Sequence, residues 1–333
     1  MSRGVDTAAG SERAATDDRP ATGKRRRRWL SWTVVTLLAV WAVVRLGGLE
    51  QGSFPAQLMT VTPYAAGIAA LTALLSLLRR NRPAALAAAL VCAVFVAIVA
   101  PRVFGAEQPA ADGTPLRVLT INLFGRGDAQ TVVDLVRRHD VEVFSALELT
   151  HAEVERLDQA GLKQLLPYRV LQPEFGATGS GIYSRHPVTE LTGLFTPLGH
   201  NMPAATVALP GGTEVELVAV HPDPPLGRKE KEWRTVLRTL PSASPSVIRV
   251  LAGDFNASLD HRPFRDLLDR GYVDAASQVG KGLTPTWPNG RAIPPIISID
   301  HVLADRRVGV GRVEILDVPG TDHRGVFAEL RLP

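Results

Sequence analysis

The sequence has only one cysteine, Cys92, among its 333 residues. A single cysteine excludes a disulfide framework within the chain and a zinc site built from cysteine ligands. The chain also has no internal repeat. Its length is enough for about two domains, and the uneven distribution of charged and apolar residues shows where they divide.

The long C-terminal part lacks an excess of positive charge. Residues 106–333 hold 24 basic and 28 acidic residues, whereas residues 1–28 hold eight and four, and residues 29–105 hold five and one. The basic isoelectric point therefore comes from the N-terminal third. Proteins that bind nucleic acid cluster Lys and Arg on their surface, so a long nucleic acid is not the expected partner of this mildly acidic part.

Three long stretches of the N-terminal third contain almost no charge. Each is long enough to cross a bilayer core of about 30 Å. The alternatives are a buried helical hairpin and, for the first stretch, a cleaved signal peptide. Arg45 is expected to extend its charge towards the interface, and Pro63 is expected to kink the second stretch. We predict three transmembrane helices within residues 29–105, at about 29–49, 54–78 and 83–104.

Positive charge flanks these stretches on one side only. Residues 1–28 have no apolar period and end in five consecutive Lys and Arg residues, which predicts a disordered basic tail. The loop at 79–82 carries three arginines, whereas the loop at 50–56 carries only one charge, which is acidic. Positively charged loops stay in the cytoplasm. We therefore predict a multi-pass plasma-membrane protein with a cytoplasmic N-terminus and an extracytoplasmic C-terminal domain.

The C-terminal domain is expected at 115–333, after a small, polar linker at 106–114. Strand-like apolar runs first alternate with amphipathic helical patterns, and the chain then becomes richer in strands. This order predicts a mixed α/β sheet domain. Strands are expected at 116–122, 142–148, 181–184, 214–221, 247–255 and 297–303, and helices at 129–139, 151–166 and 227–240.

Polar side chains that can bind cations or move protons lie where these strands end. Asn122, Glu148 and His221 each close or follow an apolar run, and Asp254 and Asp300 lie within two others. Each residue alone has an ordinary explanation, such as an Asx-turn at Asp254 or a helix start after Glu148. Several strands that end in polar residues could, however, gather these groups in one cleft.

The motifs follow a recognisable order. They are Asn122, Glu148, Gly181-Ile182-Tyr183-Ser184-Arg185, His221, Gly253-Asp254-Phe255-Asn256, Thr286-Trp287, Ile299-Asp300 and Asp322-His323. This order resembles the endonuclease/exonuclease/phosphatase superfamily, which includes DNase I-like nucleases, sphingomyelinases and inositol-polyphosphate phosphatases. The resemblance covers the whole C-terminal domain. It implies a four-layer α/β/β/α sandwich that hydrolyses phosphoesters with a divalent metal.

The resemblance also implies a role for each residue. Glu148 is implied as the principal metal ligand, with Asn122 beside it and Asp322 in support, and such an oxygen-rich set suits Mg²⁺ or Mn²⁺. His323 is implied as the general base, oriented by Asp300. The other implied roles are water positioning for Asp254, phosphate or leaving-group contacts for Asn256 and His221, and substrate binding for Arg185 and Trp287.

Several histidines have no counterpart in this pattern. His301 follows Asp300, and neighbours in a strand face opposite sides, so His301 is expected to be structural. The remaining histidines are expected at the surface or in the core: His139, His151, His186, His200 and His261.

The superfamily leaves the substrate open. The layout of three spans and an exported domain resembles VanJ-type membrane proteins, which are linked to resistance to teicoplanin-class glycopeptides. That resemblance implies a lipid-linked pyrophosphate of the cell envelope as substrate. Phe175, Trp287 and Pro294-Pro295 are expected in loops that could contact lipid. An extracellular metal-dependent nuclease and a non-catalytic envelope binding protein are the alternatives.

Overall fold

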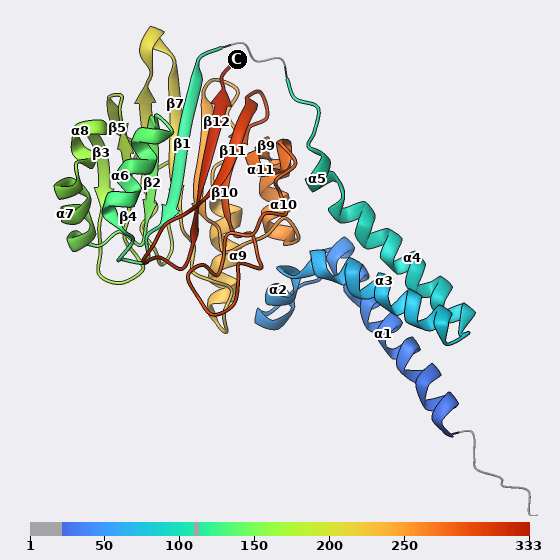
Figure 1. The fold of residues 1–333 in the computed structure, drawn as a ribbon. Helices are drawn as coiled ribbons and strands as arrows, with labels where there is room; N and C mark the ends of the chain where they lie inside the picture. The colour runs from blue at the N-terminus through green and yellow to red at the C-terminus, as the bar shows by residue number, and fades with distance from the viewer. Residues whose placement is uncertain (1–21, 110–112) are drawn as a thin grey trace, which may run out of the picture.

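The computed structural model describes residues 22–109 and 113–333 of the chain. An N-terminal group of helices lies against one end of a two-sheet sandwich (Figure 1). The first helix, α1 (Thr22–Gly47), begins within the segment expected to be disordered, so that expectation is wrong for residues 22–28. Lys and Arg have high helix propensity, which lets the helix extend beyond its apolar stretch. Residues 1–21, the rest of the expected tail, lie outside the described residues.

One sheet has six strands in the order β11-β12-β1-β2-β4-β3. β1 and β2 are parallel, and the other neighbours are antiparallel. The strands are β1 (Pro115–Asn122), β2 (Val143–Leu147), β3 (Tyr168–Gln172), β4 (Ser180–Ser184), β11 (Gly309–Asp317) and β12 (Arg324–Arg331).

The second sheet also has six strands, in the order β5-β6-β7-β8-β10-β9. β7 and β8 are parallel, and the other pairs are antiparallel. The strands are β5 (Val188–Glu190), β6 (Ala204–Ala208), β7 (Glu214–Val220), β8 (Ile248–Asp254), β9 (Tyr272–Asp274) and β10 (Asp300–Asp305).

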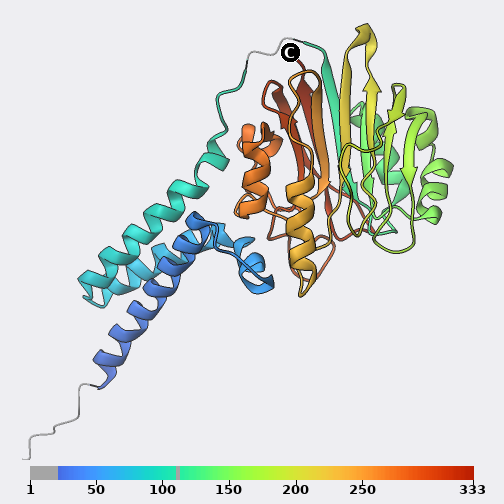
Figure 2. The ribbon, with the colours of Figure 1, turned by 180° about the vertical axis from the view of Figure 1, so that it is seen from behind.

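Helices cover the outer face of each sheet, and Figure 2 shows the resulting layers from behind. Apolar side chains such as Val143 and Val250 fill the space between the sheets. Other clusters join helices to sheet faces, for example Val133 to Phe144 and Trp233 to Leu251. The predicted α/β/β/α sandwich is therefore confirmed. Its helices are α6 (Ala129–Arg138), α7 (His151–Ala160) and α8 (Leu162–Leu165) on the first sheet, α9 (Lys229–Thr239) and α10 (Arg262–Asp269) on the second, and the short α11 (Ala275–Gln278).

Three long helices form the N-terminal bundle: α1, α3 (Thr62–Leu78) and α4 (Arg82–Val99), which continues into α5 (Pro101–Phe104) (Figure 1). Leu38, Ala69 and Phe95 are buried between them. Their outer surface exposes large apolar side chains, among them Leu71 and Leu90, which suits a hydrocarbon environment better than water. Two helical stretches, Trp29–Gly47 and Arg82–Phe104, are long and apolar enough to cross a membrane.

The expected span at 54–78 is not one helix. It consists of α2 (Ser53–Met59) and α3, which are bent by 73° at a short break, and it counts as a third span only if this bent pair is taken as one. Pro63 lies in the first turn of α3, where a missing N–H costs nothing. The chain therefore breaks just before this proline. α2 turns onto the sandwich, where Ala56 is buried against the layer formed by α9 and α10.

A buried ion-pair cluster fixes the bundle to the sandwich. Arg45 of α1 donates to Asp260 Oδ1 over 2.6 Å, and Arg102 of α5 donates to both carboxylate oxygens over 2.6 and 2.7 Å. Burial alone would raise the pKa of the Asp260 carboxyl, but the two guanidinium groups bring it below its ordinary value. Arg45 thus directs its guanidinium from the end of α1 to a carboxylate of the sandwich.

The described part of the 106–114 segment also contacts the sandwich. The Ala106 N–H donates to the Gln278 carbonyl over 3.2 Å, and Gln108 Nε2 donates to the same carbonyl over 3.3 Å. Residues 110–112 of this segment lie outside the described residues. Hydrogen bonds therefore fix this connecting segment to the sandwich in addition to the covalent connection.

Candidate active site

Strand ends from both sheets bring polar side chains to one edge of the sandwich. β1 ends at Asn122 and β8 ends at Asp254, whereas β10 begins at Asp300. β8 and β10 are antiparallel with Asp254 directly opposite Asp300, so both carboxylates lie on the same face at the same level. His323 directly precedes β12, which is antiparallel to β1. Because these neighbouring strands run in opposite directions, residues that are far apart in the sequence meet at one edge of the sandwich.

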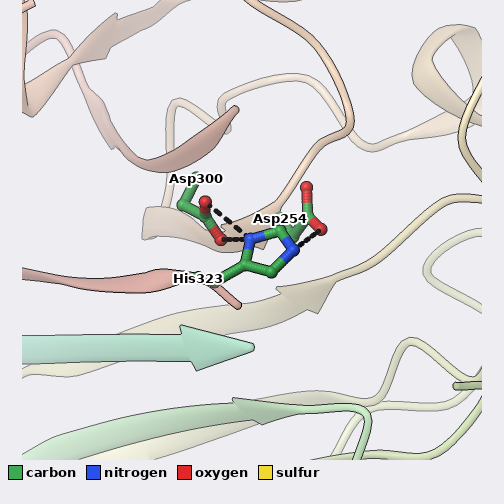
Figure 3. A group of neighbouring side chains, drawn as sticks. All are labelled: Asp254, Asp300 and His323. Atoms are coloured by element: carbon green, nitrogen blue, oxygen red, sulfur yellow. Dashed lines mark hydrogen bonds and ion pairs between the residues drawn. The ribbon is translucent and has the colours of Figure 1, made fainter. Parts of the chain in front are cut away.

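His323 lies between two carboxylates, as Figure 3 shows. Its Nδ1 is 3.0 and 3.1 Å from the two oxygens of Asp300, and its Nε2 is 3.7 Å from Asp254 Oδ2. The Asp300 N–H donates to Thr286 Oγ1, and the His323 N–H donates to Thr321 Oγ1. Two buried hydroxyl groups thus fix the backbone of this acid–imidazole pair.

Asn122 links two further carboxylates in the same place. Its Nδ2 donates to Glu148 Oε1 over 3.0 Å and to Asp254 Oδ2 over 3.2 Å, while its Oδ1 accepts from the Phe124 N–H over 3.0 Å. Glu148 has a left-handed backbone with φ 51°, an unfavourable conformation for a residue that has a Cβ. Thr150, which caps the N-terminus of α7, follows two residues later. Asn122 therefore holds both carboxylates in position.

Burial and crowding shift the protonation of these groups. Burial, with Asp300 next in importance, raises the pKa of Asp254 to about 7. Burial also raises the pKa of Glu148. Burial alone would lower the pKa of His323, but Asp300 and Asp254 raise it to about 10. The carboxylates thus outnumber the positive charge near them, and such a set favours a cation.

Asp322 provides a second observation in favour of a cation. Its Oδ2 accepts from Arg291 Nη2 over 2.7 Å. Its Oδ1 is buried, has no hydrogen-bond partner among the residues that the structure describes, and lies 4.0 Å from His323 Nε2. Such an orphaned carboxylate oxygen beside other carboxylates fits a metal ligand.

One group of three possible metal ligands differs from the ligand set that the resemblance implies, which is Asn122, Glu148 and Asp322. Ligand atoms of Asp254, Asp300 and His323 all lie within 4.8 Å of one another. Asp300 and His323 already bind each other, so this group resembles a hydrogen-bonded dyad more than an open metal site. Glu148 has one carboxylate oxygen without a hydrogen bond to the described residues.

His221 faces the same carboxylates from the second sheet. Its Nε2 is 3.8 Å from Asp254 Oδ2 and 3.9 Å from Glu148 Oε1. On its other side, His221 Nδ1 contacts His200 Nδ1 over 3.1 Å, and His200 Nε2 is 3.2 Å from Asp223. Burial lowers the pKa of both imidazoles. The sequence pattern does not single out His200, because its contact with His221 joins loops that are separate along the chain.

Asn256 and Trp287 also lie at this edge. Asn256 has φ 47°, its N–H donates to Asp254 Oδ1 over 2.8 Å, and its Nδ2 donates to the Pro222 carbonyl. Trp287 shares a pocket with Asn256 and His323. Both residues are therefore placed where a substrate at His323 would reach them.

Arg185 does not belong to the site, contrary to the implied role. It follows Ser184, which pairs with Val143 at the start of β2, whereas Glu148 follows the end of that strand. Its guanidinium contacts the Val141 carbonyl and Asp140. The antiparallel direction of β4 carries Arg185 to the opposite edge of the sheet.

His301 behaves as expected of a structural residue. Its Nδ1 binds Asp274 over 2.8 Å and its Nε2 binds the Ala257 carbonyl over 2.9 Å. Both ring nitrogens are thus occupied away from the acidic cluster.

A two-sheet sandwich with paired acids and imidazoles at its strand ends defines a class of phosphoester hydrolases. Residues 119–323 match the model of the Endonuclease/Exonuclease/phosphatase family, and the chain belongs to this family. Its members are hydrolases of phosphoesters and generally use divalent metals. A search of curated proteins found no match.

Solved structures share the fold. An endonuclease/exonuclease/phosphatase from Beutenbergia cavernae DSM 12333 is 22% identical, with a TM-score of 0.52 over 66% of this chain and 72% of that one. A humanised D. rerio TDP2 is 18% identical, with a TM-score of 0.53 over 65% and 98%. D. rerio TDP2 complexed with a single-strand DNA product is 16% identical, with a TM-score of 0.52 over 65% and 99%. These similarities support the fold.

Proposed function

We propose that the protein is a divalent-metal-dependent phosphoesterase of the plasma membrane, with its sandwich domain on the extracytoplasmic side. The observation that carries the proposal is the convergence of Glu148, Asp254, Asp300, His221 and His323 at one edge, linked by Asn122. A purely structural cluster of this kind would be costly, because buried carboxylates without full pairing destabilise a fold.

The donor set fits a hard cation, with Mg²⁺ or Mn²⁺ as the expected ion. Glu148 and Asp322 offer carboxylate oxygens that lack hydrogen bonds to the described residues. Asn122 keeps Glu148 in place through its amide. A bound cation would supply charge neutralisation for the phosphate and for the departing oxygen.

The chain's own residues then carry the proton transfers. A cation among the neighbouring carboxylates would lower the raised pKa of His323. Neutral Nε2 then removes the proton from a water molecule, and Asp300 holds Nδ1 and stabilises the resulting imidazolium. Asp254, between His323 and Asn122, orients that water. The water oxygen attacks phosphorus and the bond to the leaving oxygen breaks. Solvent water supplies a proton to that oxygen, and His323 releases its proton to solvent. His221 and Asn256 hydrogen-bond the phosphate oxygens.

The layout supports a substrate within the cell envelope. The basic loop at 79–82 lies at the end of the bundle remote from the sandwich (Figure 1), and positively charged loops stay in the cytoplasm. The sandwich is mildly acidic, which disfavours long nucleic acids. We therefore propose a lipid-linked pyrophosphate as substrate, with a contribution to glycopeptide resistance of the teicoplanin type.

A substrate panel tests this proposal with the full chain in detergent. The panel contains undecaprenyl pyrophosphate, sphingomyelin, inositol phosphates, RNA and plasmid DNA, each with Mg²⁺ or EDTA. His323→Ala should lower kcat by about 10²–10⁴-fold, and Arg185→Ala at the opposite edge serves as the matched control.

The panel also separates the alternatives. Cleavage of DNA faster than of any lipid would replace the proposed substrate with nucleic acid. No hydrolysis in the panel, together with an unchanged phenotype of His323→Ala, would identify a non-catalytic binding protein instead.

A further inference from the structure

A groove leads from the acidic cluster to the helical bundle. Its volume is about 420 Å³, which falls within the roughly 300–1,000 Å³ typical of ligand sites. His323 and Asn256 line it, and so do Gln57, Thr60 and Val61. The last three belong to α2 and to the break before α3. One wall of the groove therefore comes from the segment that precedes a membrane-type helix.

The sandwich supplies the opposite wall, which is mainly apolar. Its loops contribute Pro225, Leu226, Trp287, Ile296 and Ile299. Leu226 is 52% exposed and Ile296 is 36% exposed. Apart from His323, none of the residues that line the groove carries a titratable side chain. A polar ligand such as a nucleotide or sugar would find few partners along this surface.

Specific hydrogen bonds hold the α2 wall in place. Ser53 Oγ donates to the Pro225 carbonyl over 2.9 Å and accepts from the Gly227 N–H over 3.0 Å. His261 Nε2 binds the Ala56 carbonyl over 2.7 Å, and the Tyr64 hydroxyl donates to the Ile296 carbonyl over 2.8 Å. Hydrogen bonds therefore join the two walls of the groove on both sides of the break between α2 and α3.

We propose that this groove holds the hydrocarbon chain of a membrane-borne lipid phosphoester while its phosphate lies at His323 and Asn256. This inference rests on the proposed function and adds the site that selects the substrate. The groove reaches the start of α3, whose exposed face carries Ile68 and Leu71, so a lipid can extend from the bilayer into it without crossing a charged surface. Val61 and Leu226 are then specificity-determining residues.

A series of p-nitrophenyl alkyl phosphates tests the groove, because the leaving group is constant and only the chain length changes. The full chain in lipid nanodiscs receives the ethyl, butyl, hexyl and octyl esters. For the wild type, kcat/KM should rise by up to about fourfold for each methylene that leaves water, until the groove is full.

Val61→Glu and Leu226→Glu place a charge in the groove and should lower the octyl-to-ethyl ratio of kcat/KM by about tenfold or more. Tyr168→Glu is the matched control, because Tyr168 is 44% exposed on the edge strand β3 and lies outside the groove. Partitioning of each ester into the nanodisc is the same for all variants, so comparison with the wild type isolates the groove. The ethyl ester reports whether each variant is folded and active.

The two proposals fail in different ways. Equal kcat/KM for all four esters, still abolished by EDTA, would overturn the groove and leave the phosphoesterase standing. Glu variants that keep the wild-type octyl-to-ethyl ratio would do the same. Hydrolysis of none of the esters by the wild type would overturn the role of the groove, and a lack of hydrolysis in the substrate panel as well would overturn the proposed function.

Discussion

His200 lies behind His221, on the side away from the carboxylates, and connects it to Asp223. A histidine held in this way has a fixed ring orientation, as ligands and catalytic imidazoles do when a second group binds their other nitrogen. His200 touches no predicted substrate position, so we assign it a positioning role.

We expect His200→Ala to lower kcat about 10-fold or more, because the ring of His221 loses its partner. His200→Asn, which keeps a polar group near His221, should recover part of the loss. The pH profile of kcat/KM should shift for His200→Ala, and circular dichroism should remain unchanged. His186→Ala, at the opposite edge beside Glu142, is the control, and an unchanged profile in His200→Ala would refute the positioning role.

Metal binding gives a second prediction for single residues. Glu148→Gln keeps the size of the side chain but removes its charge, so the Mn²⁺ concentration required for half-maximal activity should rise by at least about 10-fold. Glu174→Gln, in the loop after β3, is the matched control. Equal Mn²⁺ requirements for Glu148→Gln and the wild type would exclude Glu148 as a ligand.

The sequence predicts most residues of the site because they follow strands with a clear apolar pattern. Asn122, Glu148 and Asp254 are found in this way, and the structure places Glu148 and Asp254 each within hydrogen-bond distance of Asn122. Arg185 could not be placed correctly, because its edge depends on the direction of β4 within the sheet. His200 could not be found, since its only signal is a contact in three dimensions.

At the scale of elements, Asp260 joins α1 and α5 to the loop before α10. Its carboxylate is fully buried and binds Arg45 and Arg102. Loss of one partner in such a cluster typically costs about 3–5 kcal/mol, because charges remain buried without pairing. Asp260→Asn should therefore lower the thermal stability of the full chain, and Asp266→Asn on the surface of α10 should not.

The ionisation of Asp260 predicts how the stability of the folded chain changes in acid. Its pKa in the folded chain lies below the ordinary value of 3.8. Its contribution to stability is therefore complete above that value and is lost as the pH falls through the lower, folded-state pKa. Thermal unfolding of wild type and Asp260→Asn should differ most above pH 4 and converge below it. A difference that persists unchanged at lower pH would contradict this assignment.

The sequence predicts several buried strands, but β11 with nine residues and β12 with eight were not among the expected strands. β1, β2, β7 and β8 are mostly apolar and have five to eight residues, whereas β5 and β9 have only three residues each and give no measurable period. A kink at Pro63 was expected, and the structure has the break just before it. The turn of α2 onto the sandwich was not expected, because apolar composition does not show what a segment packs against. The direction of α2 is set by the packing of Ala56 against the sandwich.

At the scale of the whole molecule, the orientation of the bundle can be measured. Alkaline phosphatase is active only outside the cytoplasm, so a fusion after Pro333 should be active and a fusion after Arg80 should be inactive. Fusions to a fluorescent protein that folds in the cytoplasm should give the opposite result. An active alkaline phosphatase after Arg80 would reverse the proposed topology.

The double attachment of Asp260 to α1 and α5 has one more consequence. In the proposed membrane topology, a domain fixed by Asp260 to two helices of the anchor cannot swing freely, so the acidic edge would stay at a constant height above the lipid head groups. The proposed lipid substrate would then have to lie in the leaflet beneath the domain, and turnover should depend on how fast lipid molecules diffuse past the anchor.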